Sequence, residues 1–136
     1  MTTKASTAPI AKKLLIQPGH AVLVLNAPEG FGAKLHPLPD GVTLSTSANG
    51  LFDCVIAFVY NKADVDAVAV SVARACKPNG VLWLAYPKVS SKLNGDLSRD
   101  KGWEAIHAEG FHGVTLVSID NFWSAMRFRS EVASAP

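Results

Sequence analysis

Three long apolar runs constrain the fold more than any other feature of the sequence. They read AVLVL over Ala21–Leu25, FDCVIAFVY over Phe52–Tyr60 and VLWLAY over Val81–Tyr86. Strands that are covered on both faces have such near-continuous apolar patterns, which are typical of parallel sheets. We therefore predict that these three runs are the central strands of a parallel sheet. Val24, Val55, Ile56 and Leu82 are expected in its core.

Segments between the runs have helical or turn patterns, as parallel connections require. Asn61 is a good N-cap for a helix through about Cys76, with Val65, Val68, Ala69, Val72, Ala73 and Cys76 on one face. The turn Lys77-Pro78-Asn79-Gly80 should then lead into the third run. Leu14–Ile16 should cover the sheet, Phe31–Leu35 should form one or two helical turns, and Val42–Ser45 should be a short strand.

The C-terminal third predicts a helix followed by a hairpin. Ser98 can cap a helix to Glu109, and Gly110 can end it. Strands are expected at Val114–Ile119 and Trp123–Arg129. Because only a short turn separates them, they must be antiparallel. The predicted architecture is a three-layer α/β domain, with a mostly parallel sheet, flanking helices and a C-terminal antiparallel hairpin.

Composition limits the function classes. The 136 residues are 49% hydrophobic and 18% charged with a net charge of +2, which fits one globular domain over 11–129 and does not suggest nucleic acid as a partner. The tails, 1–10 and 130–136, are expected to be disordered. No secretory signal is evident and no apolar stretch approaches the roughly 20 residues of a membrane span. We expect a cytoplasmic protein that does not bind membranes and can self-associate.

Two stretches carry a resemblance to a known fold. FDCVIAFVYN, a helix and then ARACKPNGVLWLAYP resemble the part of class I S-adenosylmethionine-dependent methyltransferases in which an FDxV strand precedes a helix and an LKPGG-type turn. The whole chain is also similar to a group of small, uncharacterised bacterial proteins with a shortened version of that fold, through LLIQPGHAVLVLNAPEGF, LAYPKVSS and IDNFWSAMRFR. The resemblance implies a truncated methyltransferase-like, Rossmann-like fold. It places Asn26, Ala27, Pro28, Glu29 and Gly30 where those enzymes carry their cofactor loop.

The sequence departs from the methyltransferase pattern at three points. The loop has one glycine before Phe31, and Pro28 removes a backbone donor. The region after the second strand, Leu44–Ser47, has no carboxylate to accept the ribose hydroxyls. The chain is shorter than a complete methyltransferase core by roughly one strand-helix unit. Our leading hypothesis is therefore a non-catalytic binding or self-association domain. The alternative is a small S-adenosylmethionine-dependent methyltransferase, or a nucleotide-binding enzyme, with a degenerate loop.

The candidate ligand site lies where the three central strands end. Ligands of open α/β sheets bind at the carboxyl ends of the strands, so Asn26–Gly30, Asn61, Lys88 and Ser90 are expected at one edge, between apolar walls from Phe31 and Tyr86. Lys88 beside Ser90 favours a small anionic ligand. The alternatives are that Asn26–Gly30 is only a tight turn and that the loop after Tyr86 is only solvated.

Other chemistries have no support in the sequence. The four histidines lack Cys or carboxylate neighbours at metal-ligand spacing, so no metal is expected. No serine stands in a GxSxG motif, and Cys54 and Cys76 are interpreted as buried hydrophobic residues. The arginines of the last strand, Arg127 and Arg129, are interpreted as residues that deter pairing with another sheet.

Overall fold

A single six-stranded sheet organises the chain. The computed structural model describes residues 9–88 and 97–130. The strand order is β2-β1-β3-β4-β6-β5. The first four strands, β1 (Ala21–Leu25), β2 (Thr43–Ser45), β3 (Phe52–Phe58) and β4 (Cys76–Pro87), pair in parallel. The last two, β5 (Phe111–Ser118) and β6 (Trp123–Ser130), form an antiparallel hairpin that pairs with β4 through β6. The predicted mostly parallel sheet with a C-terminal hairpin is confirmed.

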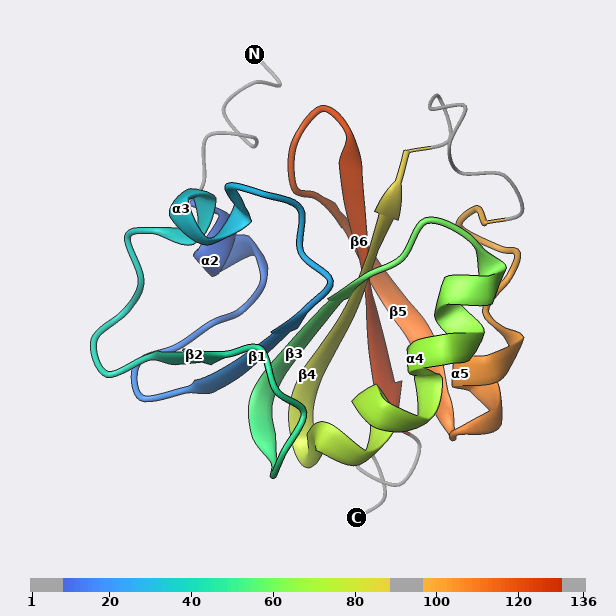
Figure 1. The fold of residues 1–136 in the computed structure, drawn as a ribbon, viewed down its shortest axis with the longest axis horizontal. Coiled ribbons are helices and arrows are strands. Elements are labelled where there is room, and N and C mark those ends of the chain that lie inside the picture. The colour runs from blue at the N-terminus through green and yellow to red at the C-terminus, as the bar shows by residue number, and fades with distance from the viewer. Residues whose placement is uncertain (1–8, 89–96, 131–136) are drawn as a thin grey trace.

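Helices cover both faces of the sheet (Figure 1). The short helices α2 (Ile10–Lys13) and α3 (Phe31–Leu35) lie on one side, and α4 (Lys62–Ala75) and α5 (Glu104–Ala108) lie on the other. Each face has its own apolar core, because alternate residues of a strand point to opposite faces. Val24 and Ile56 pack in the core of the α2/α3 face, and Val55 and Leu82 pack in that of the α4/α5 face. All four are buried, as predicted.

The helix α4 begins as predicted but ends one residue earlier. Its N-cap is Asn61, and its buried residues repeat at helical spacing, which presents an apolar face to the sheet. Cys76, predicted in the helix, is the first residue of β4. The predicted turn over 77–80 lies inside β4. There Phe52 pairs with Cys76 and Cys54 pairs with Val81, so the extra residues of β4 bulge out of register.

The predicted helix from Ser98 to Glu109 is wrong over its first half. The helix α5 begins at Glu104, and Trp103 is its N-cap. Ser98 does not cap it, because its backbone pairs with Lys101 in an isolated bridge. The physical reason is Gly102, whose φ of 99° is incompatible with a right-handed helix.

Other predicted boundaries differ by a few residues. The strand β5 begins at Phe111 rather than Val114, because Phe111 pairs with Ser130 of β6. The strand β3 ends at Phe58 rather than Tyr60, and β2 begins at Thr43 rather than Val42. The lead-in segment covers the sheet as expected, since Leu14 and Ile16 are buried. The predicted tails lie largely outside the described residues, although α2 includes residue 10 and β6 includes residue 130.

Candidate functional site

The carboxyl ends of three neighbouring strands meet at one edge of the sheet, which we call the carboxyl edge. The strands β1, β3 and β4 are adjacent and parallel, with Leu25 opposite Ala57 and Phe58 opposite Ala85. The loop after β1, the residues before α4 and the end of β4 therefore leave the sheet on the same side (Figure 1). The sequence predicted this strand arrangement. Whether the loops bind a ligand stays a prediction.

The loop over 26–30 is an exposed turn between β1 and α3. Asn26 has a φ of 59° and Gly30 a φ of 87°, so both adopt left-handed conformations that few residue types tolerate. The N–H of Phe31 donates to the carbonyl of Pro28 at 3.1 Å. Asn26, Ala27 and Glu29 are exposed, and neither polar side chain has a hydrogen-bond or ion-pair partner among the described residues. The side chains of Asn26 and Glu29 are thus free to contact a ligand.

Asn61 is the N-cap of α4 at this edge. Its Oδ1 accepts a hydrogen bond from the N–H of Asp64 at 2.9 Å, and Oδ2 of Asp64 accepts from the N–H of Tyr60 at 2.8 Å. This reciprocal arrangement satisfies free N–H groups at the start of α4. The oxygen of Asn61 is therefore already engaged as a helix cap.

Lys88 contacts the hairpin rather than the loop after β1. Its N–H donates to the carbonyl of Phe122 at 2.9 Å, and its Nζ donates to Oγ of Ser118 at 2.8 Å. Ser90 lies outside the described residues, so the predicted pairing of Lys88 with Ser90 stays a prediction.

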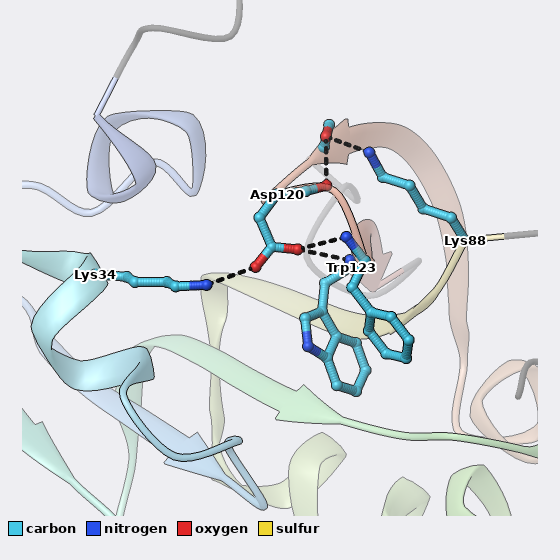
Figure 2. Close-up of polar contacts among 6 residues, drawn as sticks. Lys34, Lys88, Asp120 and Trp123 are labelled. Atoms are coloured by element: carbon cyan, nitrogen blue, oxygen red, sulfur yellow. Dashed lines mark hydrogen bonds and ion pairs between the residues drawn. The ribbon is translucent and has the colours of Figure 1, made fainter. Parts of the chain in front are cut away.

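Asp120 is the centre of a polar network that the sequence did not predict (Figure 2). Its Oδ1 accepts from the N–H groups of Phe122 and Trp123, each at 2.8 Å, and its Oδ2 lies 2.9 Å from Nζ of Lys34. Partial burial acts to raise the pKa of Asp120, but the hydrogen bonds from Lys34 and from the two N–H groups hold it below its usual value. This network ties α3 to the β5–β6 turn.

An aromatic cluster fills the sheet face beneath the same turn. The ring of Phe58 lies 4.7 Å from that of Phe31 and 4.9 Å from that of Trp123, in edge-on geometry. Tyr60 is 41% exposed, and its ring lies 5.2 Å from that of Trp123. It was missed as a candidate site residue, although a tyrosine at the end of an apolar strand was the available signal.

The predicted apolar walls do not face one crevice. Phe31 packs in the core of the α2/α3 face, whereas Tyr86 packs in the core of the α4/α5 face, with its ring 5.2 Å from that of Trp103. The prediction of two facing walls was wrong. Loops at one edge of the sheet can hold residues that pack on opposite faces, because successive side chains of a strand such as β4 alternate between the two faces.

The carboxyl edge fits S-adenosylmethionine only in part. The left-handed turn of the loop and the exposed Asn26 and Glu29 are compatible with a ligand close to the backbone. After β2, however, Ser45 and Ser47 hydrogen-bond to each other, and Leu44–Ser47 contains no carboxylate for a ribose. Four cavities of about 270 to 620 Å³ lie elsewhere in the described chain, and none is lined by residues 26–30.

The described residues offer neither a cluster of metal ligands nor a reactive cysteine thiol. Within 9–88 and 97–130, no three His, Cys, Asp or Glu side chains gather in a way that would hold a metal ion. Cys54 and Cys76 are free and buried as predicted. Burial raises the pKa of Cys54 far above its usual range and that of Cys76 to about 11, which disfavours the nucleophilic thiolate. No helix among the described residues is long and apolar enough to span a bilayer.

Comparison with known proteins identifies the fold. No protein-family model and no curated protein sequence matches the chain. One similar solved structure is the ribosomal protein L11 methylase from Lactobacillus delbrueckii subsp. bulgaricus, with a TM-score of 0.61 and 12% identity over 96% of this chain and 79% of that chain. A second is DhpI in a complex with SAH, with a TM-score of 0.59 and 16% identity over 95% of this chain and 86% of that chain. A third is the N-methyltransferase NodS from Bradyrhizobium japonicum WM9, with a TM-score of 0.57 and 12% identity over 92% of this chain and 98% of that chain. At such low identity the similarity concerns the fold alone. The chain has a methyltransferase-like α/β fold.

Proposed function

We propose that the protein is a small S-adenosylmethionine-dependent methyltransferase with a divergent cofactor loop. The observation that carries this proposal is the loop over 26–30. It keeps a sharp, left-handed turn at the end of the central strand β1, and it exposes Asn26 and Glu29 without partners in the described chain. The methyltransferase neighbours support this activity over a purely structural role.

The proposed binding edge combines two kinds of contact. Asn26 and Glu29 offer an amide and a carboxylate to the polar groups of the ligand, and the exposed ring of Tyr60 offers a stacking surface for a heterocycle. Because a carboxylate after β2 is lacking, we expect the cofactor to bind more weakly than the low-micromolar range.

Calorimetry with S-adenosylmethionine and with S-adenosylhomocysteine tests the proposal. We expect weak binding that Glu29→Gln reduces further and that Glu109→Gln leaves unchanged. Glu109 is a matched control because it is also exposed but lies at the end of α5. Thermal shift gives an independent reading, since a ligand at a hundred times its Kd adds roughly 2.7 kcal/mol of stability. Absence of binding and of a thermal shift up to about 1 mM would reject the methyltransferase proposal.

A non-catalytic self-association domain is the second candidate, and the edge strand β5 favours it. This strand is eight residues long, lies at the end of the sheet, and has no Asp, Glu, Lys, Arg or Pro. Val114 and Leu116 on it are 45% and 43% exposed. Uncharged, exposed edge strands readily pair with another sheet. Light scattering should then give twice the monomer mass, and Leu116→Lys should restore the monomer.

A further inference from the structure

One of the four cavities lies at the edge of the sheet opposite the carboxyl edge, where the parallel strands begin. It measures about 620 Å³, within the range of small-molecule sites. His20 lies just before β1, Leu51 just before β3, and the bulged segment over 77–80 belongs to the start of β4. This cavity is separate from the loop over 26–30, so nothing in the proposed function accounts for it.

One cationic side chain of the cavity wall has a buried donor atom with no partner in the described chain. Arg127, from β6, lines it, and Nε of Arg127 is buried with no hydrogen-bond partner. The whole guanidinium has no hydrogen-bond or ion-pair partner among the described residues. Leaving a buried, charged donor unpaired is costly, and native proteins rarely do so without a water or a ligand. The interpretation of Arg127 as a residue that deters pairing with another sheet is wrong, because β6 is not an edge strand but lies between β4 and β5.

The other charges of the cavity wall balance one another. Asp53 accepts from the N–H of Ala21 at 2.8 Å and lies 3.0 Å from Nζ of Lys77. These two contacts, with the backbone hydrogen bond the larger cause, hold the pKa of Asp53 below its usual value, so it is a carboxylate that neutralises Lys77. Nδ1 of His20 accepts from the N–H of Gln17, which leaves Nε2 as the ring's donor. The cavity therefore has one positive charge in excess, on Arg127.

The cavity wall is held in a strained conformation. Leu15, which lines the cavity, has a φ of 64°, an unfavourable value for a leucine. The carbonyl of the preceding residue, Leu14, accepts a hydrogen bond from Nε1 of Trp83 at 2.9 Å, and Trp83 is the register partner of Arg127 on β4. The exposed apolar side chains of Leu15 and Leu51 thus form part of the same cavity wall as Arg127.

We propose that this cavity binds a small oxyanion-bearing molecule, whose carboxylate or phosphate group pairs with Arg127 and whose apolar part contacts Leu15 and Leu51. The planar guanidinium suits such groups, which accept two parallel hydrogen bonds from it. The Nε2–H of His20 can donate to an anion but cannot bind a cation, and the carboxylate of Asp53 is already paired with Lys77, so the site favours anions over cations.

NMR titration of the full chain tests the proposal with three small molecules that each carry a charged group on a benzene ring. Phenyl phosphate and benzoate carry the oxyanion, and benzylamine is the cationic control. We expect both anions to shift the backbone amides of Gln17 and Gly80 and to leave that of Gly30 unchanged, because Gly30 lies at the carboxyl edge. The stronger anion distinguishes a phosphate from a carboxylate site. Benzylamine should shift none of them.

Two variants locate the charge. Arg127→Gln should weaken binding by about tenfold or more, since it removes a charge-assisted hydrogen-bond pair. Arg129→Gln is the matched control, because Arg129 is exposed on the same strand and does not line the cavity. Equal binding by Arg127→Gln, or no amide shift with either anion up to about 10 mM, overturns the proposal. If Arg127→Gln fails to fold, the amide shifts of the unmodified chain decide the question.

Discussion

Replacing Asp120 separates the hydrogen bonds of the hairpin turn from its ion pair. Asp120→Ala removes the acceptor of two backbone N–H groups, each at 2.8 Å, and the partner of Lys34. Losing the acceptor of a partly buried N–H costs about 1 kcal/mol each. The side chain of Lys34 is 54% exposed, so solvent screening limits the ion pair to about 0–1 kcal/mol. We expect the free energy of unfolding to fall by about 2–3 kcal/mol.

Asp120→Asn provides the internal comparison. Its Oδ1 can still accept both backbone N–H groups, so only the ion pair is lost and the cost should stay below about 1 kcal/mol. Lys34→Gln should match it. Urea unfolding followed by tryptophan fluorescence measures all three, and 2 kcal/mol corresponds to a midpoint shift of about 1 M for an m-value near 2 kcal/mol/M. If Asp120→Asn destabilises the protein as much as Asp120→Ala, the charge dominates and our reasoning is wrong.

Three further perturbations test the core and the edge of the sheet at which the parallel strands begin. Ile56→Ala should cost about 2–5 kcal/mol in urea unfolding, because Ile56 is fully buried in a central strand, and a loss below about 1 kcal/mol would contradict that position. Because the pKa of Asp53 is lowered on folding, its contribution to stability is complete at neutral pH and is lost as the pH falls below about 3.8. Asp53→Asn should therefore show a shallower acid-induced loss of stability, and an unchanged pH profile would refute this. Gly80→Ala should destabilise by about 1–3 kcal/mol, since a Cβ there would lie 3.0 Å from the carbonyl oxygen of Asp53, and a calorimetric Tm equal to the parent's would contradict it.

The strand arrangement could be predicted because it depends on local patterns. Runs such as AVLVL must be buried on both faces wherever they occur, so the parallel centre of the sheet follows from the sequence. The short turn at Asp120 likewise forces an antiparallel hairpin, whatever the rest of the chain does. The cap at Asn61 is also local, since its partner is three residues away.

The candidate site was predictable only as a location. Parallel neighbours bring residues 26–30, Asn61 and Lys88 to one edge, but the sequence could not show that Lys88 bonds to the hairpin. It also could not show that Phe31 and Tyr86 face opposite cores. Both outcomes depend on which strand pairs with β4 and on which face each side chain points to.

Contacts between residues far apart in the sequence could not be predicted from local patterns. Lys34 and Asp120 are 86 residues apart, and Trp83 and Leu14 are 69 apart, so only the folded sheet brings each pair within hydrogen-bond distance. The same holds for Arg127, which appears in the sequence as an ordinary residue of an edge strand. It lines a cavity, with its Nε buried, because β6 pairs with β4 and places Arg127 opposite Trp83, which donates to the carbonyl of Leu14. The sequence determined which segments are strands, because periodicity acts over a few residues. The tertiary structure decided which charges meet, because that depends on strand order.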